Sequence, residues 1–247
     1  MALAVRIIPT LLCRGRQLVK GTAFNSWRSV GVAAQAVRIH QSRGVDELAI
    51  LDITATAEGR GPDLDLIASL SETCFMPLAV GGGVKSVQSV RDLLNAGADK
   101  IIIGTAAHEN PRLILDIAST VGSQAVTVSV DVKAGTVWTH SGTVNTGLDP
   151  LLYAALVEKN GAGEILLSSI DRDGTMEGYD LDLIQKISHA VHIPVIASGG
   201  AGTYSDFHKA ILAGADAVAG GAIFQFSDAT PRGAAEYLAA HNIEVRL

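Results

Sequence analysis

Residues 76–86 read MPLAVGGGVKS, and residues 193–203 read IPVIASGGAGT. Each stretch has a proline, a short apolar run and then a cluster of glycines, and equivalent glycines such as Gly82 and Gly199 stand 117 positions apart. Such a run predicts a buried strand, and the glycines predict a tight turn or a close backbone approach after it. The repeat period is about half of the 247-residue chain, so we expect two related halves, residues 1–121 and 122–247.

The rest of the chain alternates in the same way. Short runs rich in Val, Ile and Leu are typical of strands buried on both faces, and the amphipathic stretches between them predict helices. The predicted strands are residues 6–12, 47–52, 77–80, 100–104, 125–132, 164–169, 194–198 and 216–220. The predicted helices are residues 32–43, 64–73, 86–96, 111–121, 150–160, 181–190, 204–213 and 232–241. Eight strands, each followed by a helix, predict an α/β fold with one closed (β/α)8 TIM barrel over residues 1–247.

Composition excludes several functional classes. The apolar fraction of 48% and the charged fraction of 18% argue against disorder. A net charge of −6 argues against a nucleic-acid partner, and no apolar stretch is long enough for a membrane span. No signal peptide is visible, so we expect a cytoplasmic protein. Two cysteines, Cys13 and Cys74, make neither a disulfide framework nor a metal cluster, and we expect no metal or cofactor.

Glycine clusters follow four of the predicted strands, where the functional loops of such a barrel gather. Gly82–Gly83 and the Gly104–Thr105 pair follow the third and fourth strands, and Gly199–Gly200 and Gly221–Ala222 follow the seventh and eighth. Glycine backbones and helix N-termini bind phosphate readily. Two such sites on opposite sides of one barrel mouth predict a small-molecule substrate with a phosphate at each end; the alternative is that the glycines serve only as tight turns.

Aspartates at strand ends are candidate proton handlers. Asp131 ends the fifth strand and is the residue for which we favour chemistry. Asp52 and Asp171 follow the second and sixth strands, and there we favour a role in tying loops or capping helices. The counterpart of Asp131 in the first half of the chain, 119 residues earlier, is Leu12.

The starts of four strands carry charge. Arg6 and Lys100 supply two positive side chains, and Glu47 and Glu164 supply two negative ones. Counting by two along the first strand places Arg6 on the same face as Leu12, so an inward Leu12 implies an inward Arg6. Inward charges need partners. These four would then form a polar gate at the bottom of the barrel; the alternative is ordinary surface charge.

The chain resembles the HisF family, the cyclase subunit of imidazole glycerol phosphate synthase, over nearly its whole length. The resemblance rests on a set of sequence motifs taken together. They are RII (6–8), LVKGTAF (18–24), VDEL (45–48), LDITA (51–55), VGGGV (80–84), GADK (97–100), TAA (105–107), ENP (109–111), GSQAV (122–126), SGTVNTG (141–147), GAGEILLSSIDRDGT (161–175), GYD (178–180) and ASGGAG (197–202).

The resemblance implies a role for each part of the barrel. It implies that a HisH-like glutaminase subunit docks at the bottom, near Asp99 and Gln124, and that ammonia passes the gate and travels along the axis. At the top it implies ring closure on a two-phosphate substrate. The implied phosphate contacts are Gly82, Gly83, Thr105, Gly174, Gly200, Gly221 and Ala222. The implied catalytic residue is Asp131, and the other implied active-site residues are Lys20, Asp52, Ser141, Ser168 and Asp173.

One departure bears on activity. The family has two catalytic aspartates, and the first is Leu12 here, which cannot transfer a proton. Gly104 replaces the family's asparagine, and Ser168 replaces a threonine. RIIPTLL (6–12) and TCFMPLAVGGG (73–83) are similar to a HisF paralogue group that passes ammonia to a sugar amidotransferase for surface polysaccharides.

These observations leave four hypotheses about the function of the chain. We favour an ammonia-conducting subunit of the paralogue type, with weak or no cyclase activity. The alternatives are a working cyclase that relies on Asp131, a non-catalytic scaffold that activates the glutaminase, and a related sugar-phosphate isomerase. Leu12 and the charged gate argue against the isomerase.

Overall fold

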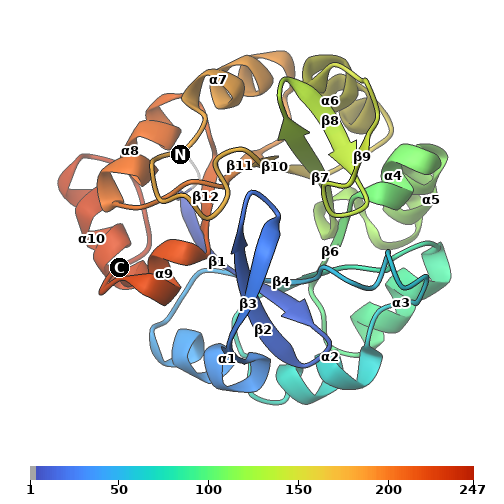
Figure 1. Cartoon of the computed structure of the whole chain (residues 1–247), viewed down its shortest axis with the longest axis horizontal. Helices are drawn as coiled ribbons and strands as arrows, with labels where there is room; N and C mark the ends of the chain where they lie inside the picture. Colours follow the sequence, from blue (N-terminus) through green and yellow to red (C-terminus); the bar gives the residue numbers. More distant parts are fainter. Residues whose placement is uncertain (1–3) are drawn as a thin grey trace.

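A computed structural model describes residues 4–247 and shows a closed barrel of eight parallel strands inside a ring of helices (Figure 1). The barrel strands are β1 (Arg6–Arg14), β4 (Leu48–Asp52), β5 (Leu78–Gly81), β6 (Lys100–Ile103), β7 (Val126–Lys133), β10 (Glu164–Ser169), β11 (Val195–Ser198) and β12 (Ala217–Gly220). β1 pairs in parallel with both β4 and β12, and β7 pairs with both β6 and β10, which closes the barrel. The predicted (β/α)8 fold is therefore confirmed.

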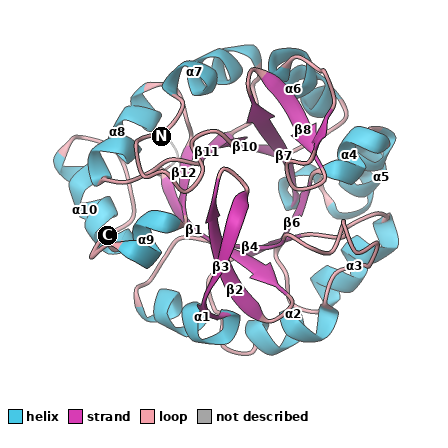
Figure 2. Cartoon of the chain, in the orientation of Figure 1, coloured by secondary structure: helices cyan, strands magenta, loops and turns pink. Residues whose placement is uncertain are grey.

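The helices cover the outside of the barrel (Figure 2). They are α1 (Ala33–Ser42), α2 (Leu64–Ser71), α3 (Val87–Asn95), α4 (Thr105–Glu109), α5 (Arg112–Val121), α6 (Pro150–Lys159), α7 (Leu181–Ala190), α8 (Tyr204–Leu212), α9 (Ala222–Phe226) and α10 (Pro231–Ala240), with a short 3-10 helix, η1 (Ser123–Ala125). Side-chain caps fix several helix starts: Asp63 and Asp180 each accept a hydrogen bond from the third helical N–H. None of the helices in the described chain is long and apolar enough to cross a membrane.

Apolar side chains form two separate clusters on the two sides of the barrel wall. The larger one fills the layer between strands and helices, with Phe207, Ile114 and Leu93 fully buried. The smaller one lies inside the barrel and comprises Ile8, Ala49, Ala79, Ile102, Leu166, Ile196, Ala217 and Ala219. The two clusters explain why the strands read as continuous apolar runs rather than alternating ones.

Two elements outside the eightfold repeat shape the mouth. β2 (Gln17–Thr22) and β3 (Asn25–Val32) form an antiparallel hairpin that crosses in front of the barrel centre in Figure 1. β8 (Thr136–Thr139) and β9 (Val144–Asn145) extend β7 beyond the barrel. These strands were not predicted from the sequence, and the first predicted helix, residues 32–43, begins one residue too early because Val32 still belongs to β3.

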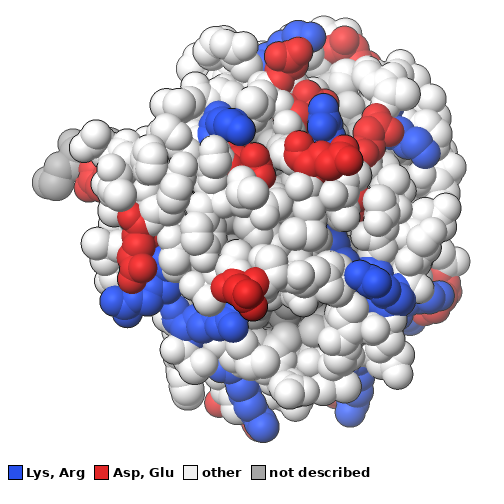
Figure 3. All heavy atoms as spheres, turned by 60° about the vertical axis from the view of Figure 1, so that its left-hand side comes forward, with Lys and Arg blue, Asp and Glu red and all other residues white. Residues whose placement is uncertain are grey.

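Charged side chains of both signs are interspersed on the molecular face shown in Figure 3. That face has no continuous positive patch of the kind that follows a nucleic-acid backbone.

Candidate functional site

The four charged residues at the strand starts meet at one end of the barrel. Arg6 donates to Glu47 at 2.6 Å and to Glu164 at 2.7 Å. The Lys100 ammonium lies 2.9 Å from Glu47 and 3.1 Å from Glu164. Each cation thus contacts both carboxylates, and each carboxylate contacts both cations.

Burial explains why the charges pair. The side chain of Glu47 is only 3% exposed and that of Glu164 is 12% exposed. Burial by itself lowers the pKa of the Arg6 guanidinium, but the two facing carboxylates outweigh it and raise that pKa above its ordinary value. The alternative reading, that these are separate surface charges, is wrong, because charges left in bulk water would not share partners in this way.

Asp99 and Gln124 lie at the same end of the barrel as the gate. Both residues are exposed. Asp99 precedes β6 and accepts a hydrogen bond from the Leu78 backbone N–H at 2.8 Å, while Gln124 lies in η1, just before β7. Their place beside the strand starts is the one that the resemblance implies for residues near a docked partner.

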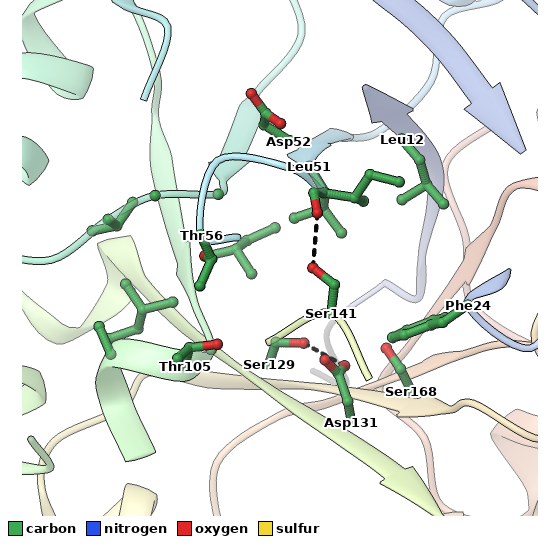
Figure 4. Close-up of a pocket in the computed structure, with 18 of the residues that line it drawn as sticks. Leu12, Phe24, Leu51, Asp52, Thr56, Thr105, Ser129, Asp131, Ser141 and Ser168 are labelled. Atoms are coloured by element: carbon green, nitrogen blue, oxygen red, sulfur yellow. Dashed lines mark hydrogen bonds between the residues drawn. The ribbon is translucent and has the colours of Figure 1, made fainter. Parts of the chain in front are cut away.

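At the opposite end, a pocket of about 790 Å³, its open mouth included, is lined by Asp131, Leu12, Ser168 and Ser141. Figure 4 shows Asp131 with its carboxylate hydrogen-bonded to Ser129, at 2.8 Å from Ser129 Oγ to Asp131 Oδ1. Leu12 lines the same pocket with its aliphatic side chain (Figure 4). The structure therefore brings Asp131 together with Leu12, the position at which the resemblance implies a second aspartate.

Burial governs the acidity of Asp131. Removal from water raises the pKa of its carboxyl group to about 6, although the hydroxyls of Ser129 and Ser168 oppose that rise and the Asp173 charge adds to it. A carboxyl group with a pKa near 6 holds a proton part of the time at neutral pH. It can therefore both give and accept protons.

The expected phosphate contacts divide between two adjoining pockets. Gly82, Gly83 and Thr105 line the pocket that contains Asp131. The other four, Gly174, Gly200, Gly221 and Ala222, line a second pocket. Leu12, Phe24, Leu51 and Ser168 border both pockets, so the two glycine sets face one shared mouth.

Backbone packing also requires glycine at these positions. Gly82 has φ +108°, and a Cβ there would collide with the Asp52 backbone. Gly200 has φ +115°, and a Cβ there would collide with the Gly178 backbone. The close-packed turns are thus one reason for the glycines, and phosphate binding stays a prediction.

Asp52 ties a loop. Its Oδ1 accepts hydrogen bonds from the Thr54 backbone at 3.0 Å and the Ala55 backbone at 3.2 Å, and its Oδ2 lies 2.7 Å from Arg60. Asp171 likewise accepts from the Ala134 backbone at 2.8 Å. Through these contacts the carboxylates of Asp52 and Asp171 hold loops in place, which is the role expected for them.

Lys20 and Asp173 form a buried pair across the mouth. Lys20 belongs to β2, Asp173 follows β10, and the distance between Lys20 Nζ and Asp173 Oδ1 is 3.0 Å. Their side chains are 5% and 11% exposed. The Lys20–Asp173 pair holds the hairpin over the second pocket, which these two residues line together.

Ser141 has a structural contact at the same mouth. Its hydroxyl donates to the Ile53 carbonyl at 2.9 Å and so fixes the loop after β8.

Several residues of this mouth were not predicted from the sequence, among them Phe24, Trp27 and Ser129. Phe24 and Trp27 come from the hairpin and line the Asp131 pocket, and no periodic pattern in the sequence predicts their position there. Ser129 also lines it, and here a signal existed, since residues two apart on a strand face the same way. Among residues 4–247, no three His, Cys, Asp or Glu side chains gather in a way that could hold a metal ion.

Comparison with known proteins agrees with this geometry. A family model described as "Histidine biosynthesis protein" matches residues 6–230. Imidazole glycerol phosphate synthase subunit HisF of Dictyoglomus thermophilum is 47% identical over 250 residues, or 99% of each chain. The chain belongs to the HisF family. The HisF subunit of Caulobacter vibrioides is 47% identical over 252 residues (99% of this chain and 97% of that protein), and that of Dictyoglomus turgidum is 46% identical over 250 residues.

Membership confirms the resemblance drawn from the motifs: the chain is a HisF-type synthase subunit. The comparisons lend no support to the narrower expectation of amidating a surface-polysaccharide sugar through a sugar amidotransferase, because the relatives named above are subunits of imidazole glycerol phosphate synthase.

Proposed function

We propose that this HisF-family barrel receives ammonia from a HisH-like glutaminase subunit docked at the strand-start end, and delivers it beside Asp131 at the other end. The observation that carries the proposal is the closed ring of Arg6, Glu47, Lys100 and Glu164 at one end of the same barrel whose opposite end holds Asp131. A ring of this kind can exclude bulk ions while its partners exchange around a small neutral molecule.

At the mouth, the proposed substrate is a small molecule with a phosphate at each end. The two glycine-lined pockets would each hold one phosphate, and the border they share, at Leu12 and Ser168, would lie under the middle of the substrate. Asp131 would then exchange protons with the reacting centre. Leu12 offers no second acid, so we expect cyclase turnover to be lower than in a barrel with two aspartates by about 10²–10⁴-fold.

A second candidate is a fully active cyclase. The observation that favours it is the pKa of about 6 for Asp131, which lets one carboxyl group act as acid and as base in turn. The test is a cyclase assay on the two-phosphate substrate of imidazole glycerol phosphate synthase with an ammonium salt as nitrogen source. Turnover close to that of relatives with two aspartates would favour this candidate over the weakened enzyme.

The role of the gate needs a separate experiment. Lys100→Met removes one cation that contacts both carboxylates, with little change in side-chain length. For a conduit, this variant should still bind the glutaminase but should release into bulk solution part of the ammonia that the wild type transfers. Unchanged transfer would favour a scaffold that only activates the glutaminase, and failure of the wild type to co-purify with any HisH-like glutaminase would contradict both.

A further inference from the structure

Strand β7 differs from the other strands of the barrel wall. Thr127, Ser129 and Asp131 occupy alternate positions along it, so their side chains share its inward face. The interior at these levels is otherwise built largely from the apolar cluster that includes Ile102 and Leu166. β7 thus carries a line of polar side chains through an apolar core.

This line is continuous between the two sites described above. At its lower end Thr127 is 2% exposed, pairs in register with Glu164, and lies 3.5 Å from Glu164 Oε2 through its Oγ1. At its upper end Ser129 Oγ donates to Asp131 Oδ1 at 2.8 Å (Figure 4). Thr127 and Asp131 are four residues apart, which on a strand is about 13 Å. Two hydroxyls therefore span the distance from the gate to Asp131.

Ammonia needs such groups when it leaves water. A small polar molecule loses its hydrogen bonds in an apolar interior, and without replacements that loss opposes entry. A hydroxyl can donate to the nitrogen lone pair and accept from an N–H. The interior also has alanines, at Ala49, Ala79 and Ala217, at positions where barrels commonly carry bulky branched side chains. β7 supplies the hydrogen-bonding groups, and the alanines fill less of the interior than branched side chains would.

We propose that Thr127 and Ser129 form a hydroxyl track along β7 that guides ammonia from Glu164 to Asp131. The proposal rests on the function proposed above and assigns the route within the barrel. Thr127 receives ammonia as it leaves the gate. Ser129 receives it next and, through its hydrogen bond to Asp131, is also a positioning residue for that carboxylate.

Thr127→Val tests the track, because it removes the hydroxyl and keeps the shape. Thr127→Ser restores a hydroxyl at that position, and Ile196→Val removes a methylene group from the same interior cluster without touching a hydrogen bond. Each change is made in the wild type and in Leu12→Asp, with the glutaminase subunit present. Product formation is measured with glutamine and, separately, with ammonium chloride, together with glutamate release.

We expect Thr127→Val to lower the ratio of glutamine-driven to ammonium-driven product about fivefold, the scale of one lost hydrogen bond. Glutamate release should persist, Thr127→Ser should recover the ratio, and Ile196→Val should keep it. An unchanged ratio in Thr127→Val, an equal fall in Ile196→Val, or a parallel loss of glutamate release would overturn the track and leave the proposed function standing. Absence of product from both nitrogen sources in both backgrounds would overturn the two together.

Discussion

Leu12 and Asp131 line one pocket, and their difference in chemistry is the sharpest feature at the scale of single residues. Leu12 pairs in register with Leu51, so an apolar wall faces the carboxylate from β1 and β4. Such a wall cannot transfer protons, yet by excluding water it helps to raise the pKa of Asp131. Leu12 therefore supplies no second acid beside Asp131.

Restoring the missing acid should restore the chemistry. We expect Leu12→Asp to increase ammonium-driven cyclase turnover about 10²-fold, because a second positioned proton donor contributes on that scale. The matched control is Leu12→Asn, which has the same shape as aspartate but cannot exchange a proton near neutral pH. An equal increase in both variants would mean that the gain comes from polarity, and no increase in either would mean that Leu12 does not limit the reaction.

The buried carboxyl of Asp131 should also affect stability. Its pKa is about 6 when folded and about 4 when unfolded, so between these values the folded state binds more protons and stability falls as pH rises. Asp131→Asn should therefore raise the free energy of unfolding by about 3 kcal/mol at pH 7 and by little at pH 4. Urea denaturation at both pH values measures this. Asp228→Asn, at an exposed loop position, is the control and should show no such pH dependence.

At the scale of elements, the β2–β3 hairpin joins the barrel through the first half of β2, which pairs antiparallel with the end of β1 and buries Leu18 and Val19. Most residues of β3 are exposed, and the buried Lys20–Asp173 pair joins β2 to the loop after β10. Arg28 adds a cation–π contact with Phe226, 4.3 Å from the ring centroid. Because the buried pair lies just beyond the part of β2 that pairs with β1, its removal should loosen the outer part of the hairpin before it affects the barrel.

Lys20→Met should increase amide hydrogen exchange in residues 20–32 at least tenfold while exchange in the barrel strands changes little. Removing one partner leaves a buried charge on Asp173, which costs several kcal/mol locally. Hydrogen exchange followed by mass spectrometry resolves the two regions. Arg16→Met, an exposed charge removal next to the same hairpin, should leave the exchange as in the wild type; similar increases in both variants would contradict a role for the pair.

The elements that sequence could predict are those held by local pattern. The eight barrel strands and their main helices agree with the expected ranges within one or two residues, because each carries a continuous apolar run or an amphipathic repeat. The hairpin gives no such pattern, since Lys20 is buried through a partner 153 residues away. α4 and α9 are also absent from the expectation, because five-residue helices are too short to show a period.

The same distinction applies to the candidate site. Strand parity places Arg6 on the face of Leu12 but leaves ordinary surface charge as an alternative, and the family resemblance favours a ring of four charges; in the structure these four charges meet. Phe24 and Trp27 could not be predicted, because they reach the pocket through the hairpin. Their position follows from long-range contacts, which a single sequence does not display.

At the scale of the whole molecule, the barrel has a ring of four paired charges at one end, which is the proposed gate, a pocket containing Asp131 at the other end and a largely apolar interior between them. The gate is self-neutralising, with two cations and two carboxylates, so it adds no net charge to an already acidic protein. A neutral passenger such as ammonia has no Coulomb barrier at such a ring, whereas an ion must break its pairs. This arrangement favours neutral over charged nitrogen at the entrance.

The repeat in the sequence leads to a prediction about assembly. If residues 1–121 and 122–247 are related half-barrels, a chain break before Gly122 leaves each half with four consecutive strands and two open sheet edges, at β1 and β6 or at β7 and β12. Such edges seek partners, and the complementary half offers the right register. The two halves, co-expressed as separate chains, should therefore associate one to one and recover the circular dichroism spectrum of the intact barrel. A break within α7, which divides a repeat unit, is the control and should give insoluble chains; equal recovery from both breaks would contradict the half-barrel hypothesis.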